Sequence, residues 1–348
     1  MPIDVPREVR ERLESRPNVV GTTVGPKRVD DRPTDEECLV VLVSRKLPRA
    51  QLGDEEAIPE TVDVDGETVR TDVQEVGDVV LQAVRTPAVR QTQRRQDRWR
   101  PAPAGVSAGH PAVSAGTLGS PPLRTADGER VVLTNAHVAA PVADAAAGDP
   151  FLQPGPADGG GPEDRIGDLL EWSGIARDRP NETDSALVAV DEGAVREDVL
   201  DVGPLAGFEE PTRDATFTKS GRTTGVTTGD LRGRDTRIRV RGYHDEPTVF
   251  EGVDTFGPMS AAGDSGSLIG VEREDGFHAT DLLFAGSDRV TFGIPLSAVQ
   301  DEHGTLRPAG SRGREDGGGS SDDGDRRRNE ASNSLLDRLL DLLATVLP

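Results

Sequence analysis

The stretch 105–298 constrains the fold most, because it is a succession of short apolar runs separated by Gly, Pro and Asp turns. The runs 131–133, 186–190 and 282–285 are examples. Short β-branched runs with turn residues between them are typical of β-sandwiches and β-barrels. The sequence therefore predicts a mainly β domain over residues 105–307.

Three segments of this domain carry a histidine, an aspartate and a serine in that order: 134–138, 183–187 and 263–267. A serine hydroxyl is a weak nucleophile at neutral pH unless a base removes its proton, and an acidic group improves that base by fixing its tautomer. Ser265, His137 and Asp184 can fill these three roles. Together the segments predict a serine hydrolase.

At these segments the chain resembles the trypsin-like (chymotrypsin-fold) serine peptidases. Their signatures T-A-A-H, D-x-A-L and G-D-S-G-G read here as Thr134-Asn135-Ala136-His137, Asp184-Ser185-Ala186-Leu187 and Gly263-Asp264-Ser265-Gly266-Ser267. The order His, Asp, Ser differs from the subtilisin-like and α/β-hydrolase orders. Two further stretches, 115–119 and 148–155, look like those of the narrow-leaf-type plant and bacterial peptidase group. The resemblance covers roughly residues 105–300 and implies a chymotrypsin-like double β-barrel with the catalytic triad between the barrels.

Each catalytic candidate has rivals in the sequence. Four other histidines lack the context of a triad: His110, His244, His278 and His303. Asp178 and Asp191 compete with Asp184, but only Asp184 begins an apolar run, which would bury a carboxylate that then needs a hydrogen-bonding partner. Ser260 and Ser267 compete with Ser265, which lies in a tight turn between two glycines. The pattern favours His137, Asp184 and Ser265.

The resemblance also implies the surroundings of the nucleophile. The backbone N–H groups of Gly263 and Ser265 would form the oxyanion hole. Met259 would lie at the base of the primary substrate pocket, and its walls would be Ala285, Gly286 and Ser287 with Phe292 and Gly293. No charged residue occurs among them, so a small or medium apolar substrate side chain is expected.

Two positions of the serine motif depart from the family pattern or its usual use. Ser267 replaces a glycine, which adds a hydroxymethyl group without abolishing the chemistry. Asp264 corresponds to an aspartate that pairs with a freshly cut N-terminus in zymogen-activated relatives. No such cut is apparent ahead of Val106 or Val113. We therefore expect constitutive assembly and a different partner for Asp264.

The charge balance is strongly acidic, with 62 acidic and 40 basic residues and a net charge of −22. Lysine occurs only at Lys27, Lys46 and Lys219. An acidic, lysine-poor surface suits concentrated salt, where like charges are screened, so we expect a halophile's protein. An acidic mesophilic protein is the alternative. The charge should repel nucleic acid and anionic membranes.

Cysteine usage and the N-terminus bear on the cellular compartment. Cys38 is the single cysteine, so no intrachain disulfide can form. No apolar stretch for a secretory signal follows Met1. We therefore expect a cytoplasmic protein. We expect no metal and no cofactor, because the segment 219–225 lacks the spacing of a phosphate loop and no Cys or His cluster has zinc spacing.

The rest of the chain divides by composition into four parts. Residues 1–85 predict a small α+β module with a hairpin turn at Asp65-Gly66. Residues 86–104 are polar and contain prolines, as in an exposed linker. Residues 308–332 lack apolar surface and predict disorder. Residues 333–348 predict an amphipathic helix, too short to span a membrane, that docks or self-associates into a homo-oligomer.

The combined prediction is a two-barrel serine endopeptidase that hydrolyses protein or peptide substrates through an acyl-enzyme. A catalytically weak or inactive scaffold with the peptidase fold is the alternative from another functional class. An esterase with the same triad is a third possibility.

Overall fold

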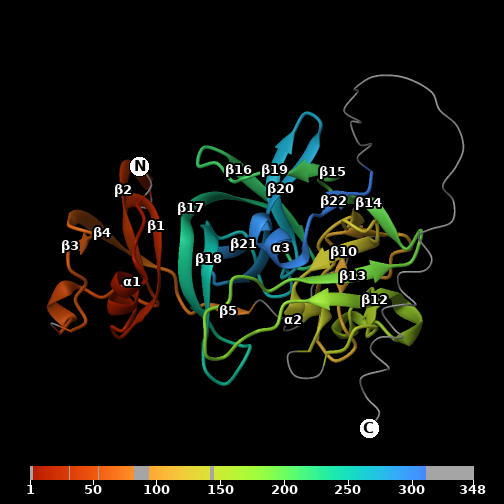
Figure 1. Ribbon diagram of the computed structural model, residues 1–348, viewed down its shortest axis with the longest axis horizontal. Coiled ribbons are helices and arrows are strands. Elements are labelled where there is room, and N and C mark those ends of the chain that lie inside the picture. The colour runs from red at the N-terminus through yellow and green to blue at the C-terminus, as the bar shows by residue number, and fades with distance from the viewer. Residues whose placement is uncertain (1–2, 31, 54, 82–93, 142–144, 311–348) are drawn as a thin grey trace, which may run out of the picture. The chain divides into compact units, whose positions relative to one another are not determined.

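The structure is a computed structural model that describes residues 3–30, 32–53, 55–81, 94–141 and 145–310 (Figure 1). The predicted helix 333–348 and nearly all of the predicted disordered segment 308–332 lie outside the described residues. Among the described helices, none is long and apolar enough to cross a membrane.

The first barrel is built on a six-stranded antiparallel sheet in the order β11-β12-β13-β10-β9-β22. Its strands are β9 (Leu123–Arg124), β10 (Arg130–Thr134), β11 (Pro150–Leu152), β12 (Arg165–Trp172), β13 (Ala186–Val190) and β22 (Arg307–Pro308). The pair β7 (Ser107–Ala108) and β8 (Gly116–Thr117) closes it, because Gly109 bridges to Leu152 and the Ser120 N–H donates to Leu133 O. Short helices connect these strands: α2 (Ala136–Ala139), η2 (Pro156–Asp158) and η3 (Pro162–Asp164).

The second barrel is a closed ring of six antiparallel strands, in the order β16, β19, β20, β21, β18, β17 and back to β16. These are β16 (Thr216–Gly221), β17 (Gly225–Val240), β18 (Thr248–Phe256), β19 (Leu268–Arg273), β20 (Gly276–Gly286) and β21 (Thr291–Pro295), drawn in green through teal to blue in Figure 1. The helix α3 (Leu296–His303) follows β21. The predicted mainly β class with two barrels is confirmed.

The N-terminal part has the helix and strands expected of a small α+β unit. It comprises α1 (Arg7–Glu14), β1 (Val19–Val29), β2 (Arg32–Val43), η1 (Arg49–Gln51), β3 (Thr61–Val64) and β4 (Glu67–Glu75). The predicted hairpin is present, since Val64 pairs with Glu67 around a turn in which Asp65 and Gly66 have φ of 52° and 86°. These positive angles explain why the turn contains aspartate and glycine.

This α+β part continues the sheet of the second barrel, because β1 pairs with β17. Thr23 Oγ1 donates to Arg234 O at 3.0 Å, and the Thr236 hydroxyl lies 2.8 Å from Thr23 Oγ1. Gly21 must be glycine here, since a Cβ would lie 2.2 Å from Arg237 O. The sequence did not predict this pairing between distant segments.

The expected linker 86–104 is packed against the barrels at its C-terminal end. Strand β6 (Ala102–Ala104) is buried and pairs with β14 (Val195–Val199), which pairs with β15 (Gly203–Phe208). Arg95 fixes the preceding turn, because its guanidinium donates to Gly105 O and to Ser220 Oγ. Polar composition therefore did not mean exposure here. Ahead of this segment, β5 (Val80–Leu81) pairs with β20.

Candidate active site

His137 lies in the short helix α2, directly after the buried strand β10. Two interactions anchor this helix: Thr134 Oγ1 donates to Thr117 O, and Asn135 Nδ2 donates to the backbone oxygen of Asp184 at 2.8 Å. The His137 N–H also donates to Asp184 Oδ1 at 3.0 Å. The backbone of the predicted base is thus tied to the predicted acid.

Asp184 is fully buried where β13 begins, and its carboxylate accepts three hydrogen bonds. His137 Nδ1 lies 2.5 Å from Asp184 Oδ2, and the Tyr243 hydroxyl donates to the same oxygen. These partners offset the desolvation of a buried carboxylate. The two rivals do not reach the imidazole: Asp178 is exposed, and Asp191 pairs with Arg165.

Tyr243 was missed in the sequence analysis. It is the only tyrosine of the chain and lies in the turn between β17 and β18. Its ring meets the His137 ring edge to face at a centroid distance of 5.8 Å. Burial, with the adjacent Asp184 charge, raises the pKa of Tyr243 well above its ordinary value, so its hydroxyl remains a donor. Its isolation in a polar turn was the one available signal, since a buried tyrosine hydroxyl needs a partner.

The other imidazole nitrogen of His137, Nε2, is buried and has no hydrogen-bond partner within the described residues. With Nδ1 donating to Asp184, the lone pair of a neutral imidazole is on Nε2. The geometry therefore provides a proton acceptor at this atom.

Ser265 lies in the turn between β18 and β19, between Gly263 and Gly266, whose φ angles are 99° and 96°. Ser265 is only 1% exposed, and its Oγ donates to Phe284 O at 3.1 Å. In the part of the chain that the structure describes, no hydrogen bond joins Ser265 Oγ to His137 Nε2. Gly263 and Gly266 have the positive φ angles that only glycine adopts without strain.

Gly116 connects the serine turn to the histidine helix. A Cβ on Gly116 would meet Val138 Cγ2 at 2.5 Å and Ser265 O at 3.0 Å, and the neighbouring Thr117 N–H donates to Ser265 O at 2.9 Å. Val138 directly follows His137. The serine turn and helix α2 therefore both pack against the Cβ position of one glycine, which brings the two barrels together at this point.

The rival serines are engaged elsewhere. Ser260 Oγ pairs with Thr291 Oγ1 at 2.7 Å, and Ser267 Oγ donates to Asp264 O at 2.6 Å. Ser267, where the resemblance would give glycine, thus forms a hydrogen bond within its own turn. By contrast, the backbone N–H groups of Gly263 and Ser265 donate to no acceptor among the described residues. Unpaired N–H groups at a buried turn are available to an anionic oxygen.

Asp264 finds its partner in Lys219, which lies on β16. Lys219 Nζ is 3.3 Å from Asp264 Oδ2, and both side chains are 0% exposed. Asp264 also accepts hydrogen bonds from Ala261, Thr223 and Thr224. Burial lowers the pKa of Lys219, and the Asp264 carboxylate opposes that shift. An internal lysine is therefore the partner of Asp264, in place of a freshly cut N-terminus.

The residues predicted to form the substrate pocket contact other parts of the chain. Met259 is buried in an apolar cluster with Phe217, Phe256 and Leu283, so its side chain packs in the second barrel. Among the expected wall residues, Ala285 and Gly286 pair with Leu81 and Val80, and Ser287 Oγ donates to Val76 O at 2.5 Å.

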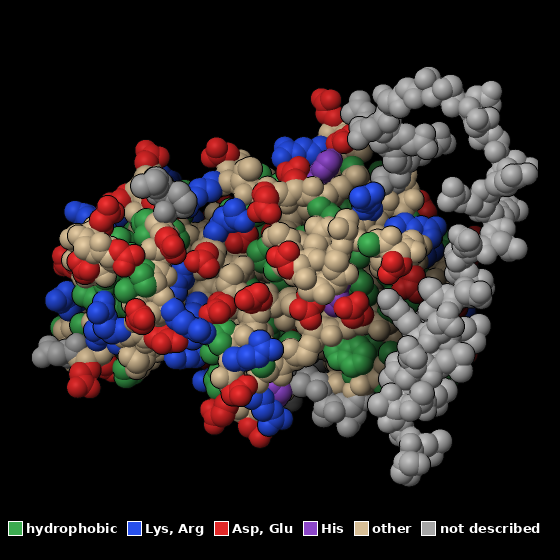
Figure 2. All heavy atoms as spheres, viewed as in Figure 1, with side chains coloured by type: hydrophobic (Ala, Val, Ile, Leu, Met, Phe, Trp, Pro, Cys, Tyr) green, Lys and Arg blue, Asp and Glu red, His purple; other side chains and the backbone are tan. Residues whose placement is uncertain are grey.

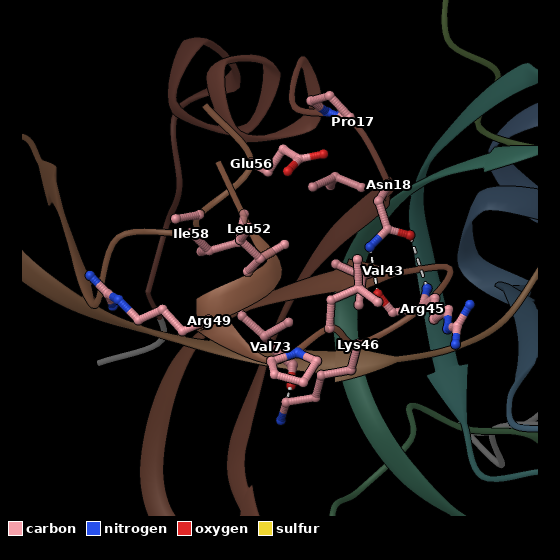
Figure 3. A pocket seen from close by; sticks show the side chains of 14 residues that line it. Pro17, Asn18, Val43, Arg45, Lys46, Arg49, Leu52, Glu56, Ile58 and Val73 are labelled. Atoms are coloured by element: carbon pink, nitrogen blue, oxygen red, sulfur yellow. Dashed lines mark hydrogen bonds between the residues drawn. The ribbon is translucent and has the colours of Figure 1, made fainter. Parts of the chain in front are cut away.

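A separate cavity of about 380 Å³ lies in the N-terminal part (Figure 3). Leu52, Ile58 and Val73 provide apolar lining, while Arg45 and Arg49 lie at its border. None of the three catalytic candidates lines it. This cavity is therefore distinct from the candidate active site.

Two buried carboxyl groups, those of Asp254 and Asp281, belong to residues that neighbour Gly293 in the second barrel. Burial raises the pKa of Asp254 to about 7 despite Arg234, which lowers it, while Glu210 raises it further. Burial and the nearby Asp254 raise the pKa of Asp281 well above its ordinary value. At pH values between the ordinary and the raised pKa, these carboxyl groups are therefore protonated in the folded chain and ionised in the unfolded chain.

We expect the free energy of unfolding to fall as pH rises. For Asp254 the decrease extends from its ordinary pKa of 3.8 to about 7, because proton binding favours the folded chain in this interval. The midpoint of thermal unfolding, measured at fixed salt, should be lower at about pH 8 than at about pH 5. Asp254→Asn should weaken this pH dependence, while the exposed control Asp301→Asn should not. An unchanged dependence in Asp254→Asn contradicts the expectation.

No protein-family model matches the chain, and no curated protein matches it. Several solved structures are similar to this chain. One is Thermobifida fusca Protease A, which is 17% identical in sequence and has a TM-score of 0.43. The match covers 59% of this chain and 98% of that one. Nocardiopsis Protease matches at 15% identity and a TM-score of 0.42, with the same coverage. A glutamic acid specific serine protease matches at 17% identity and a TM-score of 0.43, covering 59% of this chain and 100% of that one.

Proposed function

We propose that this chain is a serine endopeptidase in which Ser265 is the nucleophile, His137 the general base and Asp184 the group that orients the base. The observation that carries the proposal is the buried His137–Asp184 pair beside the glycine-flanked serine turn, in which Nε2 has no hydrogen-bond partner among the residues that the structure describes. A base held by an acid on one nitrogen and open on the other is the arrangement that activates a hydroxyl.

The reaction follows from these atoms. Rotation of the Ser265 side chain releases Phe284 O and turns Oγ toward His137 Nε2, a bond that tightens when substrate is bound. Nε2 takes the hydroxyl proton as Oγ bonds to the peptide carbonyl carbon. Nε2 then gives this proton to the departing amine as the carbon–nitrogen bond breaks. Water, deprotonated by the same nitrogen, releases the acyl group and restores Ser265.

The remaining groups of the site stabilise charge. The unpaired N–H groups of Gly263 and Ser265 would donate to the carbonyl oxygen as it becomes negative, an effect of about 3 to 4 kcal/mol per donor in comparable sites. Asp184, bonded to Nδ1, orients the imidazole and stabilises the imidazolium that forms. Tyr243 is a positioning residue, because its hydroxyl holds Asp184 against the histidine.

One observation favours the alternative of an inactive scaffold: Ser265 Oγ is bonded to a backbone oxygen and forms no bond to His137 among the described residues. In a scaffold this bond would be permanent. In the enzyme it is exchanged as the serine rotates. The two functions therefore differ in the reactivity of Ser265 itself.

A fluorophosphonate probe separates these functions. The probe reacts with a serine only when a base activates the hydroxyl and an oxyanion site receives the phosphoryl oxygen. We expect stoichiometric modification at Ser265, located by peptide mass spectrometry, and none in His137→Ala. The matched control is Ser260→Ala, which should label like the wild type. A folded wild-type protein that does not react favours the scaffold.

We also propose that the enzyme works in concentrated salt in the cytoplasm of a halophile. Acidic side chains are distributed across the visible face in Figure 2, interspersed with basic ones. The excess of 62 acidic over 40 basic residues makes mutual repulsion strong at low salt and weak when the charges are screened. Self-association through residues 333–348 likewise remains a proposal.

A further inference from the structure

The segment before residue 82 pairs with β20, the strand that contacts the predicted nucleophile. Strand β5 pairs antiparallel with the end of β20, where Leu81 is opposite Ala285 and Val80 is opposite Gly286. The next residue of β20 toward Ser265 is Phe284, whose oxygen accepts the Ser265 hydroxyl. On β20, the residue opposite Leu81 is therefore the immediate neighbour of the residue that contacts the Ser265 hydroxyl.

A peptide substrate needs the same edge. Because Phe284 O contacts Ser265 Oγ, an extended peptide that brings a carbonyl carbon to this hydroxyl could pair with the adjacent residues Ala285 and Gly286. Extended peptides commonly bind to proteins by adding a strand to a sheet edge, with backbone hydrogen bonds providing affinity. The direction of β5 is also that of such a peptide, because its antiparallel register carries it from Gly286 toward Phe284.

The segment is held on its other side by the turn that carries Tyr243. The Leu81 N–H donates to Arg241 O at 3.0 Å, and the Arg241 N–H donates to Val79 O at 3.2 Å. Because backbone groups alternate along a strand, the N–H and C=O of Val80 face β20. Val79 is buried, whereas Val80 is 41% exposed. The groove is thus a two-sided slot for one extended strand.

The slot also indicates which side chains it accepts. Leu81 packs against the hydrophobic core and lies over Gly242, where a Cβ would be 3.2 Å from Leu81 Cδ1. Gly242 has a φ of 118°, so a larger residue would be strained there as well as crowded. An aliphatic side chain therefore fits at this position of a bound strand.

We propose that Val79–Leu81, which occupies the slot between Ala285–Gly286 and Arg241, competes there with the extended segment of a peptide substrate, and that the position of Leu81 accepts an aliphatic residue of that substrate. This inference rests on the proposed peptidase function. Substrate binding then requires displacement of β5, and the apparent affinity equals the intrinsic affinity multiplied by the fraction of molecules in which the slot is open.

Proline substitution tests the competition. Val80→Pro removes the N–H that faces β20, and Leu81→Pro removes the N–H that donates to Arg241 O, so each weakens the seating of β5. Val80→Ala is the matched control, because it shortens the same side chain and keeps the backbone groups. All variants are compared in the full chain with two probes: fluorescein-labelled casein, an extended protein substrate, and a fluorophosphonate, which needs only Ser265 and the oxyanion site.

We expect kcat/KM for casein to rise roughly tenfold or more in both proline variants, as expected for opening a mostly occupied site. Val80→Ala should match the wild type, and the fluorophosphonate rate should be the same in all four proteins. A synthetic peptide with the sequence 78–81 should inhibit Val80→Pro competitively. If one proline variant does not fold, as judged by its circular dichroism, the other decides.

Two results would overturn the inference in distinguishable ways. If Ser265 reacts with the fluorophosphonate while casein turnover is unchanged or lower in the proline variants, β5 does not compete and only the inference fails. If Ser265 reacts in none of the folded proteins, the proposed function fails and the inference with it.

Discussion

Ser265→Ala is expected to lower kcat for casein by about 10⁶-fold, since removing the nucleophile of a serine triad abolishes the acyl-enzyme route. The residual rate would come from the oxyanion site and substrate binding alone. The rate is best measured in the Val80→Pro background, in which the substrate slot is open, with enzyme concentration set by protein absorbance. The substitution removes one hydrogen bond, to Phe284 O, and leaves the turn glycines in place.

The matched control is Ser260→Ala, because Ser260 lies in the same turn region and bonds to Thr291 rather than to the site. It should retain wild-type turnover. Two outcomes would count against the assignment: undiminished hydrolysis by Ser265→Ala, or an equal loss in Ser260→Ala. The first would move the nucleophile elsewhere, and the second would indicate a structural effect of the turn.

Lys219→Met is expected to lower the free energy of unfolding by about 3 to 5 kcal/mol, because it leaves the Asp264 carboxylate buried without its cation. Lys219 and Asp264 are both 0% exposed, so water cannot replace the lost partner. Activity should fall as well, since Asp264 precedes Ser265 and its hydrogen bonds to Thr223 and Thr224 fix the serine turn. Urea unfolding followed by circular dichroism measures the stability term.

A double-mutant cycle separates the ion pair from general packing. Lys219→Met with Asp264→Asn should be less destabilised than the sum of the two single variants, because the second change removes the charge that the first left unpaired. Lys46→Met is the control, since Lys46 is exposed and should tolerate the change. Additive effects of the two buried substitutions would refute a charge-based role for Lys219.

Local patterns predicted the parts of this molecule that depend on short stretches of chain. The apolar run 131–133 lies in β10, the run 186–190 is β13, and the Asp65-Gly66 turn closes the predicted hairpin. The motif order also identified His137 and Asp184, which the structure brings into contact. Alternation and turn residues suffice for these features because neighbouring residues determine them.

Contacts between segments that are distant in the chain could not be predicted from local sequence patterns. Tyr243 approaches Asp184 only once the second barrel is closed, and a lone tyrosine has no spacing that predicts its partner. Ala102 was assigned to an exposed linker because its neighbours are polar, yet pairing with β14 buries it. The place of Met259 at the base of a substrate pocket stays a prediction from resemblance, while the packing of its side chain in the barrel core was not evident from its neighbours in the sequence. These outcomes depend on three-dimensional packing rather than local pattern.

The pairing of β1 with β17 has a practical consequence for any attempt to isolate the two barrels as a recombinant fragment. A protein that began at residue 94 would lack β1 and would expose the backbone of β17 from Arg234 to Ile238 as a raw sheet edge. Such edges join those of other molecules and promote aggregation. If that fragment were insoluble, the cause would therefore be the loss of β1 from the edge of β17, not an inability of the barrels to fold.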